Sequence, residues 1–84
     1  MKAVIVVWND AEDPAEGKPW MDAEEVDQFS THDCLVRSIG FVKSDTEKYL
    51  TLIGDAIPEL NHYGRVTKIP RAMVVSVVDL GATE

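Results

Sequence analysis

Apolar residues along this chain gather in five short runs, separated by polar segments that contain glycine or proline. The runs are rich in β-branched residues, which favour strands over helices. Gly40 lies inside the second run and predicts a bend or bulge there. The longer link at 54–64 should hold one helical turn near 57–60. We therefore predict five strands, at residues 3–8, 34–43, 48–53, 65–69 and 73–80.

One short helix is predicted between the first two strands. Asp22 is a favourable N-cap, and Glu25 stands where the second side chain of a capping box is needed. Acidic residues crowd the first turn, where the helix dipole favours them. The helix should cover residues 23–29, after an irregular loop at residues 9–21.

The first and last predicted strands are apolar on both faces. An antiparallel sheet in a monomer normally keeps one face in contact with water, so the second face needs a cover. The short helix can cover part of one strand. The remainder predicts an interface between subunits of a homo-oligomer, which would also occupy open strand edges. The alternative is that the loops 9–21 and 54–64 fold over these strands.

The chain has 84 residues, which is the size of one small domain, residues 1–84. Residues 1–33 contain nine acidic and two basic residues, whereas residues 34–84 contain six of each. The net charge of −7 therefore belongs to one segment. A negative field repels phosphate backbones, so nucleic acid is an unfavoured partner.

The cysteine content and the N-terminal run bear on the cellular compartment. Cys34 is the single cysteine, which excludes a disulfide within one chain and fits a reducing compartment. Residues 1–8 are apolar but too short for a signal core or a membrane span. We expect a cytoplasmic protein that does not associate with a membrane.

Catalysis and metal binding find little support in the sequence. His32 and Cys34 are two residues apart, and such side chains on a strand stand about 6.5–7 Å apart, too far for the histidine to activate the thiol. A metal site would need two further ligands, and the acidic loop 9–17 does not fit the calcium-loop pattern. We therefore predict no enzymatic activity, no cofactor and no metal, with Cys34 as a small buried residue.

A small anionic ligand is one binding partner that these side chains suggest. Arginines grip phosphates and carboxylates, and aromatic residues beside loops often line pockets. Two alternatives are favoured over it: the tryptophans can serve in packing, and the basic residues, with Lys68, can neutralise the acidic segment of the same or a neighbouring subunit. The candidate ligand-binding residues are Arg37, Arg65, Arg71, Trp8, Trp20 and Tyr63.

The chain resembles a family of short, uncharacterised phage and prophage proteins. The residues that carry the resemblance extend over nearly the whole chain: Trp8-x-Asp10, Trp20, Cys34-x-x-x-Ser38-x-Gly40-Phe41, Tyr49-Leu50-x-Leu52, Ile69-Pro70-Arg71 and Ser76-x-x-x-Leu80. Together with the strand pattern, it implies a mainly β fold, a small five-stranded, strongly bent (Sm-like) barrel with one short helix. It also implies a phage-associated protein in the cytoplasm of a bacterial host. It supplies no catalytic residue.

Three functions follow from these observations. The first is a non-enzymatic, homo-oligomeric binding module that captures a host protein or a small anionic ligand, such as a nucleotide. The second is an acidic interaction protein or nucleic-acid mimic that acts through residues 9–33. The third is an RNA-binding Sm-like ring, which rests on the fold resemblance and is disfavoured by the charge.

Overall fold

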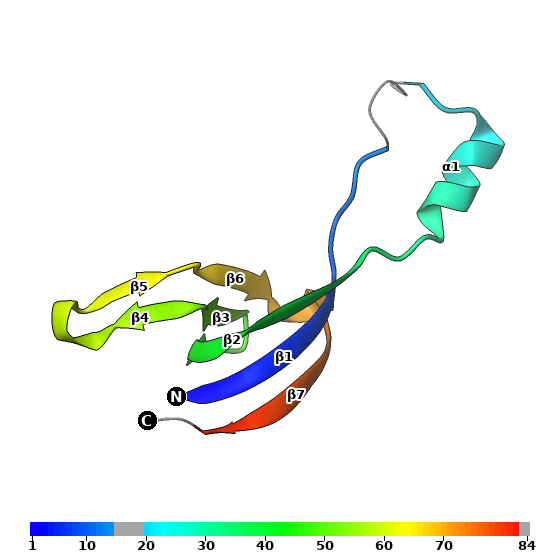
Figure 1. Cartoon of the computed structure of the whole chain (residues 1–84). Coiled ribbons are helices and arrows are strands. Elements are labelled where there is room, and N and C mark those ends of the chain that lie inside the picture. The colour runs from blue at the N-terminus through cyan, green and yellow to red at the C-terminus, as the bar shows by residue number, and fades with distance from the viewer. Residues whose placement is uncertain (15–19, 83–84) are drawn as a thin grey trace.

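A computed structural model describes residues 1–14 and 20–82. Five strands form one antiparallel sheet in the order β6-β3-β2-β1-β7 (Figure 1). Residues 15–19 of the predicted loop and residues 83–84 lie outside the described chain. The sheet strands are β1 (Lys2–Asn9), β2 (Leu35–Asp45), β3 (Tyr49–Ile53), β6 (Thr67–Pro70) and β7 (Val74–Ala82).

The five predicted strands and the predicted helix are confirmed, and the prediction for residues 54–64 was incomplete. The helical turn expected there is the 3-10 helix η1 (Pro58–Leu60). Two three-residue strands flank it, β4 (Asp55–Ile57) and β5 (His62–Gly64), and they pair as a hairpin. Three-residue strands are too short to show an alternation of apolar and polar residues, which is why the sequence did not reveal them.

The core lies on one face of the sheet, which we call the inner face. Its fully buried side chains come from three strands, β1, β3 and β6, and Trp8, Val42 and Val74 pack against them. Gly40 lets β2 and β3 approach closely, because a Cβ atom there would lie 2.8 Å from the carbonyl oxygen of Ile53. The bulge expected near Gly40 lies further along the strand, where the β2–β3 register shifts between Val42 and Ser44. The core cluster is Val4, Val6, Leu50, Leu52 and Ile69.

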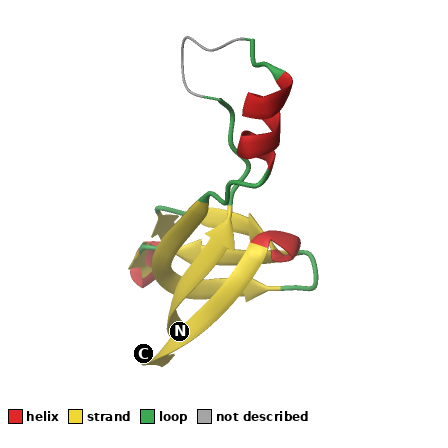
Figure 2. Cartoon of the chain, turned by 90° about the vertical axis from the view of Figure 1, so that its right-hand side faces the viewer, coloured by secondary structure: helices red, strands yellow, loops and turns green. Residues whose placement is uncertain are grey.

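The sheet curls strongly around this core but stays open (Figure 2). Within the described residues no ladder joins β6 to β7, and the two strands are connected by the 3-10 helix η2 (Arg71–Met73). The predicted closed barrel is therefore not confirmed. The molecule is a mainly β protein with a five-stranded antiparallel sheet and one short α-helix.

Two segments project from the sheet and make the molecule elongated (Figure 1). Its radius of gyration is 16.6 Å, against about 12 Å for a compact domain of this length. One projection is the β4–β5 hairpin. The other, which we call the arm, comprises the described residues 10–14 and 20–34 and carries α1 (Ala23–Ser30). The expectation that this helix covers a strand was wrong, since α1 points away from the sheet and has no buried residue.

The helix itself forms as its sequence predicts. The Glu25 amide donates to the Asp22 side chain at 2.8 Å, and the Asp22 amide lies 3.5 Å from the Glu25 carboxylate, which completes the capping box. The start of α1 is thus encoded locally, whereas its position relative to the sheet is not. None of the described helices has the length and apolar character needed to cross a membrane.

The outward sides of the first and last strands are not covered by the rest of the chain. On β1, Val4 and Val6 are buried while Ile5 and Val7 on the opposite face are half-buried. The prediction that this strand is buried on both faces therefore holds for one face. On β7 the exposure is greater, because every residue after Val74 is exposed. Neither the arm nor the hairpin supplies the cover that the alternative in the sequence analysis required.

Candidate functional site

A hollow opens on the inner face of the curled sheet, next to the core. It has a volume of about 260 Å³, slightly below the usual range for pockets that hold drug-sized ligands. Apolar side chains from four strands form its floor, and charged side chains stand at its rim. We call it the inner hollow; its lining residues are Lys2, Val4, Val42, Asp45, Leu50, Arg71 and Val77.

Arg71 is the best-placed cation of this hollow. Its backbone amide donates to the Lys48 carbonyl at 2.8 Å, which anchors η2 to the turn between β2 and β3. Its guanidinium nitrogen Nη2 lies 3.0 Å from Oδ1 of Asp45. A guanidinium has five N–H donors in a rigid fork, so one contact with Asp45 leaves donors for a second acceptor.

Pro70 and the turn that follows it explain why Arg71 reaches the hollow. Pro70 ends β6 with φ −58°, and the chain then makes the single turn of η2 before β7 begins. Proline fixes φ near this value, so the direction of the turn is set by the local sequence. Arg71 is the first residue of that turn, where the chain passes from one sheet edge to the other.

A second ion pair stands at the rim, between Lys2 and Asp79. Lys2 Nζ lies 3.3 Å from Asp79 Oδ2. The Gly81 amide donates to Asp79 Oδ1 at 2.8 Å, and this hydrogen bond, together with Lys2, lowers the pKa of the Asp79 carboxyl. Lys2, Arg71 and Asp45 line the hollow, and Asp79 pairs with Lys2 beside it, so neither sign of charge dominates there.

The other two arginines named in the sequence analysis lie elsewhere. Arg65 donates to both carboxylate oxygens of Asp55, at 2.8 and 3.2 Å, which lowers the pKa of Asp55 and raises that of Arg65. Its left-handed backbone, φ 50°, turns the chain out of the hairpin. Arg37 is exposed on β2, directly across from Val7 and so on the side of the sheet opposite the core.

The aromatic residues are also dispersed. Trp8 packs against the core, and its indole N–H donates to Ser38 Oγ at 3.0 Å. Trp20 lies on the arm with 88% of its surface exposed. Tyr63 belongs to the hairpin, where the Lys43 ammonium lies over its ring at 4.5 Å. Of the six predicted ligand-binding residues, Arg71 alone lines the inner hollow.

Over the described parts of the chain, the arginines named as ligand candidates do not pair with the acidic segment of their own chain, and pairing with that of a neighbouring subunit stays a prediction. Arg65 and Arg71 pair with aspartates of the hairpin and of β2. Lys68 lies over the Tyr49 ring at 4.6 Å instead. Within the described residues, the ion pairs of these arginines involve Asp55 and Asp45, so the arm keeps its negative charge.

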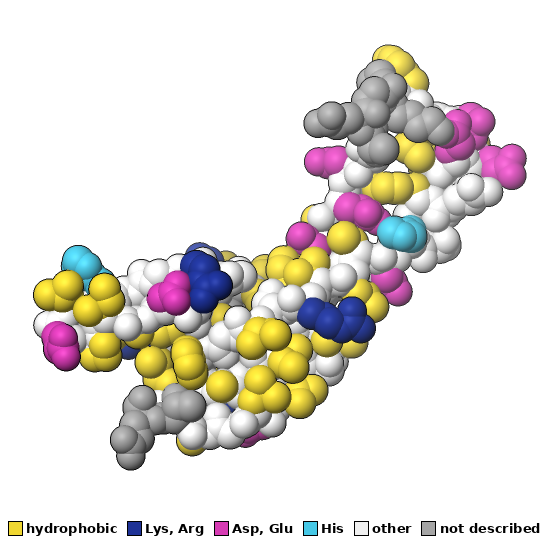
Figure 3. Space-filling view, in the orientation of Figure 1, with side chains coloured by type: hydrophobic (Ala, Val, Ile, Leu, Met, Phe, Trp, Pro, Cys, Tyr) yellow, Lys and Arg dark blue, Asp and Glu magenta, His cyan; other side chains and the backbone are white. Residues whose placement is uncertain are grey.

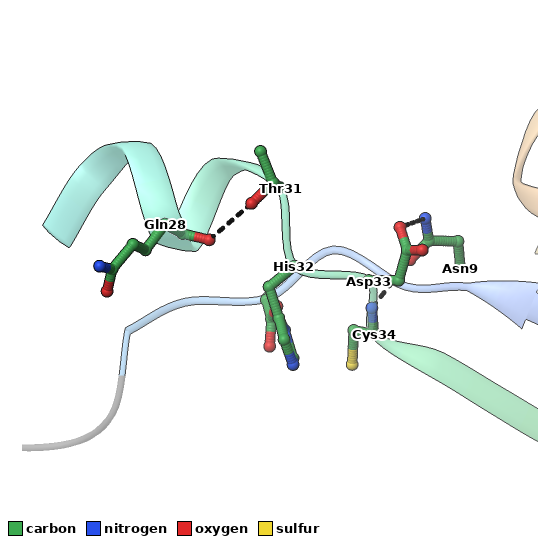
Figure 4. Close-up of polar contacts among 7 residues, drawn as sticks. Asn9, Gln28, Thr31, His32, Asp33 and Cys34 are labelled. Atoms are coloured by element: carbon green, nitrogen blue, oxygen red, sulfur yellow. Dashed lines mark hydrogen bonds and ion pairs between the residues drawn. The ribbon is translucent and has the colours of Figure 1, made fainter. Parts of the chain in front are cut away.

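The base of the arm, where the chain leaves β1 and returns to β2, is called the neck here. It holds His32 and Cys34, whose residue types suggest catalysis (Figure 4). His32 Nδ1 lies 2.6 Å from Glu12 Oε1, which raises the pKa of His32. The half-buried Cys34 has its backbone amide bonded to the Asn9 side chain at 3.0 Å, and Asn9 also donates to Asp33. These contacts tie the outgoing and returning chains together.

No group of three or more metal-ligating side chains comes together among residues 1–14 and 20–82. The predictions that the protein has no metal, no cofactor and no catalytic activity stay predictions.

Sequence reasoning missed the acidic and basic partners at the hollow. Lys2 and Val4 have the same parity on a strand, so Lys2 could have been placed on the face of the core. Asp79 has the parity of Val77 on the last strand, so it too could have been placed on that face. Asp45 had no such signal, because β2 shifts register between Val42 and Ser44. A register shift reverses the side on which the following residues point.

Comparisons with protein families, with curated proteins and with solved structures gave no match.

Proposed function

We propose that this protein is a non-enzymatic binding module that captures a small amphipathic anion in the inner hollow. The observation that carries the proposal is an apolar floor with an arginine fork at its edge. Ligand sites usually combine mostly apolar walls with a few convergent polar groups, and the inner hollow has this composition.

The two parts of the hollow would recognise different parts of the ligand. The apolar floor, Val4, Val42, Leu50 and Val77, would contact a hydrocarbon or aromatic body. Arg71 would receive a carboxylate or phosphate, because its planar fork matches both groups. The anion would share the guanidinium with Asp45, which holds the fork in place from one side.

We also propose a fold class and an origin for this binding module. The fold would be a small, strongly bent (Sm-like) barrel whose edge strands β6 and β7 stay unpaired with each other within the described chain, and the strong curl of the five-stranded sheet supports this assignment (Figure 2). The resemblance to phage and prophage proteins supports a phage-associated role in the cytoplasm of a bacterial host. RNA binding is less favoured, because Lys2, Arg65 and Arg71 each pair with an aspartate.

The proposal is tested with octanoate, an amphipathic carboxylate small enough for the hollow, and with octylamine as its cationic counterpart. Titration of each into the isotope-labelled protein is followed by amide chemical shifts. We expect octanoate to shift Val42, Val77 and Arg71 in a saturable manner, and octylamine to bind more weakly. Arg71→Gln should weaken octanoate binding by about tenfold, the effect of losing one charge-assisted hydrogen-bond pair.

Arg65→Gln is the matched control, because Arg65 is also paired with an aspartate but lies outside the hollow. It should leave octanoate affinity unchanged. Equal affinity of wild type and Arg71→Gln would contradict the assignment of Arg71 as the anion site. Failure of octanoate to bind, or shifts confined to the arm or hairpin, would contradict the assignment of the hollow.

A further inference from the structure

The side of the sheet opposite the core, which we call the outer face, carries an apolar stripe across three strands. The register places Ile39 of β2, Ile5 of β1 and Val78 of β7 side by side. Ile39 is 71% exposed and Val78 is 50% exposed. Figure 3 shows hydrophobic side chains gathered over the sheet. Contiguous exposed apolar surface on a small protein normally marks an interaction site.

A single cation is set beside this stripe. Arg37 pairs with Val7 of β1, and the next pair on the same face of the sheet is Ile39 with Ile5. It is exposed, and it has no hydrogen-bond or ion-pair partner among the described residues. An arginine next to apolar side chains is typical of the central part of protein interfaces, and here it lacks an anion.

The arm presents the complementary set of groups. Val26 on α1 is 45% exposed and Trp20 before it is almost fully exposed. Glu24 and Asp27 are exposed on the same short helix, and acidic side chains gather on the arm (Figure 3). An eight-residue helix is marginal in water without packing, so α1 needs an apolar surface to rest on.

We propose that two copies of this chain exchange arms, so that α1 of each copy packs on the outer face of the other. The arm's apolar side chains would cover the stripe at Ile5, Ile39 and Val78, and its carboxylates would approach Arg37. The arm points away from its own sheet in both views (Figures 1 and 2), so the occupant is a second copy. The contact is reciprocal, and a two-fold dimer therefore contains it twice.

The charges allow a test in which two defective variants repair each other. In Arg37→Glu the outer face becomes negative while the arm is unchanged. In the double variant Glu24→Lys with Asp27→Lys the arm becomes positive while the outer face is unchanged. Analytical ultracentrifugation of the full chain at low ionic strength should show a wild-type dimer. Each variant alone should raise the dissociation constant by at least about tenfold, through like-charge contacts at both copies of the interface.

An equimolar mixture of the two variants should form dimers again. In the mixed dimer the acidic arm meets Arg37, and the positive arm meets the glutamate of Arg37→Glu. Restoration would separate arm exchange from a dimer in which the two outer faces pack directly together, because the arm charges would have no effect on the latter.

Lys48→Glu and the double variant Glu47→Lys with Glu59→Lys are the matched controls. They change the net charge by the same amounts at exposed positions on the β2–β3 turn and the hairpin tip. Both should dimerise as wild type does, and circular dichroism should show that all variants fold.

Three results would overturn the proposal. A monomeric wild type would show that the proposed interface does not form, and a basic protein would then be the expected partner of the arm. A dimer that tolerates both variants would show that the outer face or the arm is not involved. Separate defects that do not recover on mixing would show that the two surfaces do not meet.

Discussion

The sheet and the arm are stabilised in different ways. Each fully buried side chain of the described residues belongs to the five-stranded sheet, and most of them form one cluster. The arm has no buried residue on its helix and is held by a capping box and by the polar contacts of its neck. Loss of a core contact should therefore unfold the domain, whereas loss of an arm contact should open the arm alone.

The largest expected effect comes from crowding the sheet. Gly40→Ala would place a Cβ atom 2.8 Å from the Ile53 carbonyl oxygen, and backbone cannot move aside as a flexible side chain would. β2 and β3 would have to separate, at a cost of about 2 kcal/mol in the free energy of unfolding. Urea denaturation followed by circular dichroism measures this cost.

Gly64→Ala in the hairpin is the matched control for this prediction. A Cβ atom there would meet the Asp55 side chain at 3.6 Å, which is an ordinary contact. Its free energy of unfolding should stay within about 0.5 kcal/mol of wild type. Similar losses in both alanine variants would show that steric crowding at β2 and β3 is not what makes Gly40 necessary.

A smaller loss of stability, confined to the arm, is expected when the N-cap of α1 is removed. Asp22→Ala removes the side chain that accepts from the Glu25 amide, and N-cap losses of this kind cost about 1 kcal/mol. Because α1 has no buried residue, this cost should appear as faster amide exchange in residues 23–30 with the sheet unchanged. The experiment uses dilute protein, so that self-association does not contribute.

Gln28→Ala serves as its control, since alanine favours the helix interior and leaves the cap intact. Should Asp22→Ala also speed exchange in β1 and β2, the sheet and the arm would form one cooperative unit.

The smallest effect concerns the neck. The hydrogen bond and charge of Glu12 raise the pKa of His32 above its ordinary value. A raised folded-state pKa means that this contact stabilises the neck fully below the ordinary histidine pKa of about 6.5, and that the contribution is lost as pH rises through the folded-state value. Both groups contact solvent, so the effect on stability should be slight.

Glu12→Gln should bring the His32 pKa back towards its ordinary value, as measured by an NMR titration of the imidazole protons. Asp13→Asn, in the same segment, is the control and should leave most of the shift in place. An unchanged His32 pKa in Glu12→Gln would show that the two side chains do not pair in solution.

The sequence predicted the strands and the helix because each has a local signal. Runs of β-branched residues marked the strands, and Asp22 with Glu25 marked the start of α1. The direction of the arm had no such signal, since Val26 and Phe29 would serve equally well against this sheet or another surface. The openness of the sheet depends on whether β6 and β7 pair, which is a long-range contact and not a property of either strand.

The candidate site could be predicted only in part, because it depends on both local signals and long-range contacts. Arginines are visible in a sequence as possible anion ligands, but their neighbours are set by register. Arg71 follows Pro70 at a turn and reaches the inner hollow, while Arg37 and Arg65 lie on the outer face and the hairpin. The ion pair of Lys2 with Asp79 had no signal in the sequence, because it depends on the register between β1 and β7.

The positions of the two tryptophans give the molecule one optical reporter for each region. Trp8 packs against the core and donates to Ser38, so its emission follows the sheet. Trp20 is almost fully exposed on the arm, so a soluble quencher such as acrylamide should reach it freely. Trp20→Phe leaves Trp8 as the single reporter of the sheet, and Trp8→Phe leaves Trp20 as the single reporter of the arm. The fluorescence of the two variants therefore distinguishes unfolding of the sheet from burial of the arm.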